Sequence, residues 1–268
     1  MLKQRIITAL ILLPIALCGF FLLEGSGFAL FIGLVVTLGA WEWARLAGFN
    51  AQGARVAFAA VVAVLLFGLH IFPDVAPWVL GAAVLWWAVA TYLVLTFPQS
   101  AVHWSTTATK LLIGLLILLP AWQGLVLIKA MPLGNWLIMA VMVLVWGADI
   151  GAYFSGRKFG KRKLAPKVSP GKSWEGVFGG LLLSLLITAV VGVVRGWSAT
   201  QMFAALAGAA LIVLISVVGD LTESMFKRQS GIKDSSNLLP GHGGVLDRID
   251  SLTAAIPVFA VLLWMAAS

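Results

Sequence analysis

Long apolar runs recur along almost the whole chain, and they constrain its fold more than any other feature. A helix needs about 20 predominantly apolar residues to cross the hydrocarbon core of a bilayer. Runs near that length cover residues 5–23, 27–46, 56–72, 77–97, 110–128, 133–153, 175–194, 201–224 and 249–267. Only 10% of the residues are charged, while 61% are hydrophobic. The sequence therefore predicts an integral membrane protein with about nine spans.

The spans are expected to be helices, because their apolar residues are continuous and do not alternate with polar ones as in a barrel strand. The predicted fold class is an all-α, polytopic helical bundle. Its longest polar stretches are 154–174 and 225–248, so no separate soluble domain is expected. Residues 1–130 are predicted to form a scaffold with lipid access and dimer contacts. Residues 131–268 are predicted to carry the chemistry.

The basic residues indicate how the chain is oriented in the membrane. If the N-terminus is cytoplasmic, 16 of the 18 lysines and arginines lie at the cytoplasmic ends of the spans, and only Lys129 and Arg195 lie outside. This distribution follows the positive-inside rule and favours an inner-membrane protein with a cytoplasmic N-terminus. The net charge of +8 is explained by the same bias and by contact with anionic lipid, so nucleic acid is not an expected partner.

Two acidic residues lie inside apolar runs near the cytoplasmic end of a span. A carboxylate at mid-bilayer costs on the order of 2.5–3.5 kcal/mol, and somewhat less near the interface, so Asp149 and Asp220 each need a partner or a function. A structural ion pair with a neighbouring base is the alternative. Glu42 stands three residues before Arg45, and an ion pair between them at the interface explains it.

Helical spacing connects these acids to other polar groups. Ser224 and Lys227 follow Asp220 along one helix face, and Asp247 and Asp250 share a face if the last helix begins near residue 246. Two acidic faces are thus expected to meet at the cytoplasmic boundary. Carboxylates packed together repel one another unless a cation lies between them, and an all-oxygen donor set suits Mg²⁺. The number of cations is left open.

The stretch "GRKFGKRKLAPKVSPGKSWEG" joins seven basic residues with glycines and prolines that prevent a continuous helix, so a mobile, cationic loop is predicted. Lys167 and Lys172 flank "VSPG" and precede a helix whose N-terminus would favour a phosphate. Ser173 is expected to cap that helix, with Glu175 in its first turn. "PGKS" is not a P-loop, because Pro166 stands where the pattern requires glycine.

The stretch "SMFKRQSGIKDSSNLLPGHGGVLDRID", from Ser224 to Asp250, resembles the signature of the phosphatidate cytidylyltransferases, also called CDP-diacylglycerol synthases. Its elements are S-x-x-K-R, K-D, P-G-H-G-G and D-R-x-D. The upstream "GADIGAYFSGRKFGKRKLAPKVSPGKSWEG" is similar to a second region of that family, whereas the first 130 residues resemble it only in hydropathy.

The resemblance implies a Mg²⁺-dependent transfer of CMP from CTP to phosphatidic acid, at a cytoplasmic-facing site of a homodimer. By position, it implies that Asp220, Asp247 and Asp250 are metal-site acids and that Ser224 and Lys227 contact substrate phosphates. Asp220, Lys227 and Asp247 are the candidate catalytic residues. Asp149 joins the candidate metal ligands, and the further candidate substrate-binding residues are Lys167, Lys172, Arg228, His242, Gly243 and Arg248. His242 either donates to a phosphate or the base, or holds the local turn.

Other functions are weighed against this one. An ion-coupled transporter of an anionic substrate also has intramembrane acids, but here the charges gather at one edge and no inverted repeat is visible. A CDP-alcohol phosphotransferase would carry a D-G-x-x-A-R motif, which the sequence lacks. A purely structural scaffold gives no reason for Asp149 and Asp220.

Overall fold

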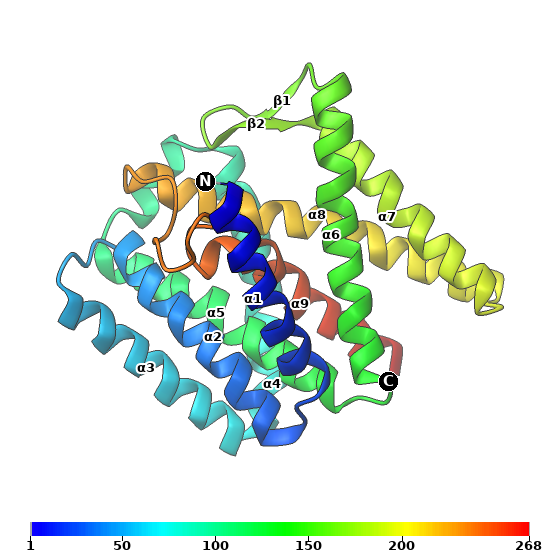
Figure 1. Ribbon diagram of the computed structural model, residues 1–268, viewed down its shortest axis with the longest axis horizontal. Helices are drawn as coiled ribbons and strands as arrows, with labels where there is room; N and C mark the ends of the chain where they lie inside the picture. Colours follow the sequence, from blue (N-terminus) through cyan, green and yellow to red (C-terminus); the bar gives the residue numbers. More distant parts are fainter. Residues whose placement is uncertain (1, 268) are drawn as a thin grey trace.

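The protein is a bundle of long helices in the computed structural model, which describes residues 2–267, apart from the side chains of residues 2, 3, 5 and 267 (Figure 1). The helices are α1 (Leu2–Phe21), α2 (Gly25–Leu46), α3 (Gln52–Ile71), α4 (Ala76–Leu95), α5 (Thr107–Ala130), α6 (Gly134–Phe159), α7 (Trp174–Val194), α8 (Ala199–Gln229) and α9 (Leu246–Ala267). Two short 3₁₀ helices, η1 (Pro73–Val75) and η2 (Gln99–Trp104), lie in connections. Two short strands, β1 (Lys163–Ala165) and β2 (Ser169–Ser173), pair antiparallel.

The predicted all-α membrane bundle is confirmed. Within the described residues, eight helices are long and apolar enough to cross a membrane, and Ile6–Phe21 of α1 is a shorter apolar helix. The start of α7 is capped by Ser173, as predicted: its Oγ accepts the Gly176 N–H at 3.2 Å. Ser198 and Gln201 form a capping box at the start of α8. Glu175 stands in the first turn of α7 as expected.

The two polar stretches are shorter than predicted, because the flanking helices continue into them. The first narrows to residues 160–173, which form the hairpin of β1 and β2 and not an irregular loop; the second narrows to 230–245. The extra turns end in basic pairs, Arg157 with Lys158 and Lys227 with Arg228. Positive charges in a last turn stabilise a helix through its macrodipole, which explains why these polar residues remain helical.

Helix α8 is longer than a bilayer's hydrocarbon core is thick. A helix of 31 residues is about 46 Å long, whereas the hydrocarbon core is about 30 Å thick. Buried aromatic rings support this end, since the ring centroids of Trp43 and Trp104 lie 4.8 and 4.4 Å from that of Phe226 on α8. The polar end of α8 is therefore anchored in packed core.

Contacts between distant segments show which loops share one end of the bundle. Ser230 Oγ donates to the Leu46 carbonyl at 2.9 Å, and Arg228 Nε donates to the Val168 carbonyl at 3.1 Å. The α2–α3 turn, the hairpin and loop 230–245 thus lie together, whereas Lys129 pairs with Glu24 at 3.1 Å at the other end. Which end faces the cytoplasm stays a prediction, and the side chains of Lys3 and Arg5 lie outside the described residues.

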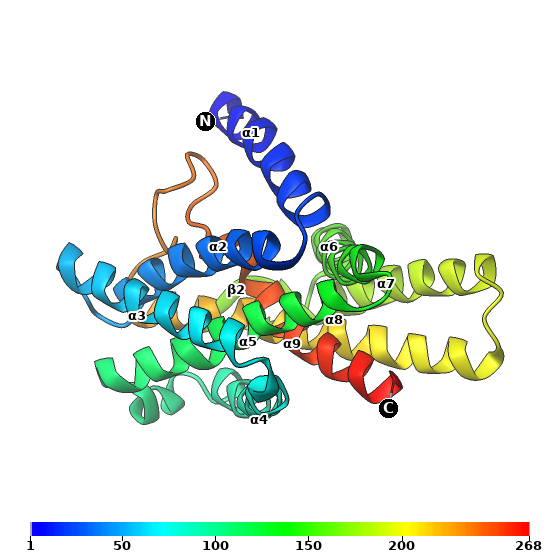
Figure 2. The ribbon, with the colours of Figure 1, turned by 90° about the horizontal axis from the view of Figure 1, so that it is seen from below.

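Helices α6 and α7 approach each other closely through small residues. A Cβ on Gly151 of α6 would lie 2.6 Å from the carbonyl oxygen of Gly179 on α7, so glycine is needed there. Figure 2 shows α1 standing apart from the rest of the bundle. Its N-terminal half reaches loop 230–245, where Thr8 Oγ1 donates to the Pro240 carbonyl at 2.9 Å.

Candidate active site

A polar cavity of about 530 Å³ lies between α6, α8, α9 and loop 230–245. Acids from three separate helices reach it: Asp149 from α6, Asp220 from α8 and Asp250 from α9. Further polar residues of the lining are Ser224, Lys227, Arg228, Lys233, Asp234, Asp247, Arg248 and Ser251. The structure thus brings together eight of the candidate residues, and α9 begins at Leu246 as the shared face of Asp247 and Asp250 requires.

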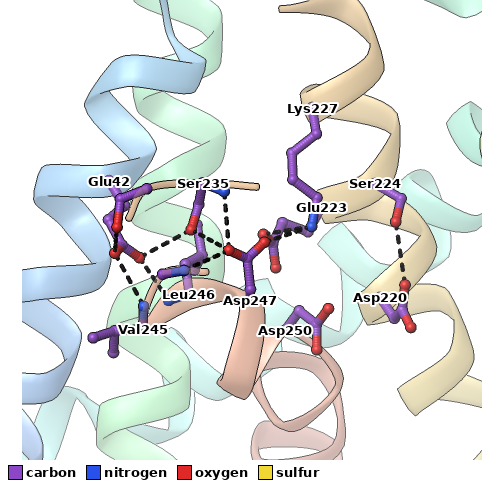
Figure 3. A network of polar contacts seen from close by, with 12 residues as sticks. Glu42, Asp220, Glu223, Ser224, Lys227, Ser235, Val245, Leu246, Asp247 and Asp250 are labelled. Carbon is purple, nitrogen blue, oxygen red and sulfur yellow. Dashed lines mark hydrogen bonds and ion pairs between the residues drawn. The ribbon is translucent and has the colours of Figure 1, made fainter. Parts of the chain in front are cut away.

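Asp247 is the most heavily bonded acid of this cavity (Figure 3). Its Oδ1 accepts from Lys227 Nζ at 2.7 Å. Its Oδ2 accepts the N–H and the hydroxyl of Ser235 at 2.9 and 2.8 Å, and the N–H of Gly244 at 2.7 Å. Asp247 therefore fixes both Lys227 and loop 230–245 in this structure, and a metal bound here would have to share oxygens that these donors already use.

Lys227 has a second acidic partner that the sequence analysis missed. Its Nζ lies 3.1 Å from Glu223 Oε1, and the side chains of Glu223 and Lys227 are only 4% and 12% exposed. Glu223 precedes Lys227 by one helical turn, so i,i+4 spacing was the signal that could have identified it. A lysine between two buried acids is held in one place, because leaving either charge unpaired would be costly.

Asp220 is tied to the β hairpin. Its Oδ2 lies 2.6 Å from Lys172 Nζ, and its Oδ1 accepts from Ser224 Oγ at 3.2 Å. Lys172 also lines a second, smaller cavity of about 210 Å³ between α6, α7, α8 and β2. We call this the apolar cavity, since most of its lining is alanine, valine and glycine; Asp149 lines both cavities. The ion pair of Lys172 and Asp220 thus stands at the boundary between them.

Asp149 and Asp250 lack the ion pairs that engage Asp220 and Asp247. Asp250 Oδ1 accepts the N–H of Ser251 at 2.7 Å, and among the described side chains neither acid has a basic partner within 4 Å. Within residues 2–267, no three His, Cys, Asp or Glu side chains stand close enough to form a complete metal site. Mg²⁺ does not require one, because it commonly binds one or two carboxylates and completes its shell with water and substrate phosphates. The oxygen donors present fit such a site.

Besides Lys172 at the boundary, three candidate substrate-binding residues are absent from the polar cavity lining. Lys167 is exposed in the turn of the hairpin. His242 and Gly243 belong to a tight turn in which the Leu239 N–H donates to the Gly243 carbonyl and the His242 N–H to the Leu239 carbonyl, both at 2.8 Å. Gly243 has a φ of +84°, and a Cβ there would lie 2.7 Å from Asp247 Oδ2. This glycine allows the turn to close against Asp247; a contact with substrate stays a prediction for all three.

The prediction of an ion pair between Glu42 and Arg45 is wrong. Glu42 is fully buried, and its carboxylate points away from its own helix into loop 230–245. It accepts hydrogen bonds from the hydroxyls of Ser235 and Ser236 and from the N–H groups of Val245 and Leu246. Arg45 donates instead to the Ser235 carbonyl at 3.4 Å. The backbone N–H groups at the start of α9 have no partner within the helix, so they bind this carboxylate together with two loop hydroxyls. These contacts take the place of an ion pair with Arg45.

Comparison with known proteins matches residues 3–266 to the cytidylyltransferase family. A phosphatidate cytidylyltransferase of Pseudomonas aeruginosa is 73% identical over 266 residues, covering 99% of this chain and 98% of that protein. One of Haemophilus influenzae is 44% identical over 283 residues, covering 97% and 98%. One of Staphylococcus epidermidis is 44% identical over 134 residues, covering 47% and 48%. No support for a transporter comes from these comparisons, and the chain belongs to the cytidylyltransferase family.

Proposed function

We propose that this chain is a phosphatidate cytidylyltransferase, which transfers CMP from CTP to phosphatidic acid and forms CDP-diacylglycerol and pyrophosphate. Its full-length similarity to proteins of that name supports the reaction. The observation that carries it is a charged cavity at one end of a membrane bundle, directly beside an apolar one. A soluble triphosphate needs the first environment and a lipid needs the second.

The reaction requires the protein to position its two substrates and to stabilise phosphate charge. It does not require a general base. The phosphomonoester of phosphatidic acid has a second pKa near 6, so its attacking oxygen is anionic at neutral pH. The cationic lining supplies contacts for the phosphates of both substrates: Lys227, Arg228, Lys233 and Arg248, with Lys172 at the boundary. Holding the lipid oxygen in line with the α-phosphorus removes much of the entropic barrier.

One or two of the carboxylates of Asp149, Asp220 and Asp250 would hold Mg²⁺, because all three line the same cavity and Mg²⁺ completes its shell with water and substrate phosphates. There the metal would supply neutralisation of the phosphate charge, including the charge that grows on the pyrophosphate leaving group. Asp247 keeps Lys227 and loop 230–245 in position, and it can join the metal only by exchanging one of its present donors.

The proposed reaction is tested on purified protein in mixed micelles with CTP labelled in its cytidine or α-phosphate. Label should enter a chloroform-soluble product, with one pyrophosphate released per product, only when phosphatidic acid, CTP and Mg²⁺ are all present. Label in the lipid without phosphatidic acid, or no transfer in the complete mixture, would contradict the proposal.

The apolar cavity is proposed to receive the glycerol and the first acyl carbons of the lipid. Val217→Phe would fill part of it, since Val217 lies on its lining. We expect the KM for phosphatidic acid to rise about tenfold, equivalent to about 1.4 kcal/mol, with the KM for CTP nearly unchanged. Leu214→Phe is the matched control, because Leu214 is a 46% exposed side chain on the same helix. Equal effects on both KM values would contradict a lipid subsite.

We further propose that the protein lies in the inner membrane with its polar cavity open to the cytoplasm. We also propose that it is a homodimer. The collected basic loops support the orientation, and the family resemblance supports the dimer, which chemical cross-linking would test. In a Cys18→Ser background, Thr200→Cys should react with an impermeant maleimide in intact spheroplasts. Lys167→Cys should react only after the membrane is disrupted. The opposite labelling pattern would contradict the proposed orientation.

A further inference from the structure

We infer that Glu42 is a positioning residue of the active site and that it works through its negative charge. This inference rests on the proposed function only for its kinetic readout. Glu42 lies on α2, about 180 residues before the polar residues of α8. Yet its carboxylate bonds to loop 230–245 and to the start of α9, the helix that carries Asp247 (Figure 3).

Three donors, and the shared hydroxyl of Ser235, surround both oxygens of Glu42. Oε1 accepts from Ser236 Oγ at 2.6 Å and from the Val245 N–H at 3.0 Å. Oε2 accepts from the Leu246 N–H at 2.6 Å and lies 3.2 Å from Ser235 Oγ, whose single proton it shares with Asp247 Oδ2. No basic side chain among the described residues lies within 4 Å of it to form an ion pair. Its charge is therefore balanced by hydroxyls and by the N-terminal amides of α9.

Ser235 joins this carboxylate to the site. Its hydroxyl lies within hydrogen-bonding distance of Glu42 Oε2, at 3.2 Å, and of Asp247 Oδ2, at 2.8 Å. Asp247 in turn holds Lys227 at 2.7 Å. Glu42 also holds the first amide of α9, the helix on which Asp247 and Asp250 stand. One buried carboxylate thus sets the start of α9 and the loop that faces the polar cavity.

A glutamine cannot replace Glu42, although it has the same shape. Each oxygen of Glu42 accepts from a backbone N–H, and a backbone N–H can only donate. In either orientation of a glutamine amide, its NH₂ group would face one of these N–H groups. Glu42→Gln should therefore release one side of the contact, at Val245 or at Leu246, and loosen loop 230–245.

The variants Glu42→Gln, Glu42→Asp and Ser235→Ala test this role. For correctly folded protein, we expect Glu42→Gln to lower kcat by about 30-fold or more and Ser235→Ala by a smaller factor. The KM for phosphatidic acid should change little, because the apolar cavity is lined by α6, α7, α8 and β2, which do not contain Glu42. Glu42→Asp, which keeps the charge, should recover part of the lost kcat. Glu24→Gln is the matched control, since Glu24 pairs with Lys129 at the opposite end.

Amide hydrogen exchange gives a readout that does not need activity. Faster exchange at Val245 and Leu246 in Glu42→Gln, but not in Glu24→Gln, is the expected result. If wild-type protein shows no transfer, the proposed function fails. The exchange experiment still tests whether Glu42 holds the amides of Val245 and Leu246. The inference is overturned if Glu42→Gln keeps wild-type kcat and protection, or if Glu42→Asp shows no recovery. If Glu42→Gln does not fold, an unchanged kcat in Ser235→Ala overturns it.

Discussion

Asp247→Asn is expected to lower kcat for cytidylyl transfer by a factor of about 10²–10³, while the protein still inserts and keeps its helices. Asp247 Oδ1 accepts from Lys227, and Oδ2 accepts the N–H groups of Ser235 and Gly244 as well as the Ser235 hydroxyl. An asparagine NH₂ group cannot accept from any of them. Either Lys227 or the loop must lose its contact, and both face the polar cavity.

The control for this variant is Asp74→Asn, because Asp74 is an exposed acid of η1 between α3 and α4. It should retain wild-type kcat. Initial rates with saturating CTP, phosphatidic acid and Mg²⁺ provide the measurement, with circular dichroism as the check on helix content. A folded Asp247→Asn protein with nearly wild-type kcat would refute the role assigned to Asp247.

Asp220→Asn is the second change for which we expect a large effect, again about 10²-fold or more in kcat. Asp220 lies in the polar cavity and pairs with Lys172 at 2.6 Å, so its loss removes a proposed metal ligand and frees a lysine at the boundary between the cavities. The Mg²⁺ concentration that gives half-maximal rate should also rise about tenfold.

Lys172→Met separates the two consequences of losing Asp220. It frees Asp220 from its ion pair without removing a carboxylate, so the half-maximal Mg²⁺ concentration should not rise. Rates measured across a Mg²⁺ titration compare the two variants. An unchanged Mg²⁺ requirement in Asp220→Asn would assign Asp220 to the ion pair alone.

The sequence predicted the features that depend on local spacing. Continuous apolar runs predicted the membrane helices, and the three-residue spacing of Asp247 and Asp250 predicted their shared face. Four-residue spacing placed Ser224 beside Asp220, where its hydroxyl now donates. These predictions succeeded because each depends only on helical geometry within one segment.

Features that depend on distant segments were not predictable. Arg45 was the nearest cation to Glu42 in sequence, whereas the donors that bind Glu42 lie near residues 235 and 245, on a loop whose position follows from packing of the whole bundle. The hairpin was missed because its prolines and glycines also suit an irregular loop. The division into a scaffold before residue 130 and a catalytic part after it stays a prediction, although Glu42 of the first part reaches the active-site loop.

Divalent-cation binding tests the central claim most directly, namely that acids from separate helices form one cation site for the triphosphate. Mn²⁺ prefers the same oxygen ligands as Mg²⁺, and its free concentration can be followed by electron paramagnetic resonance. With purified protein and CTP, we predict binding that is about tenfold weaker in Asp220→Asn and in Asp250→Asn, and unchanged in Asp74→Asn. Equal Mn²⁺ affinity in wild-type protein and all three variants would contradict the account.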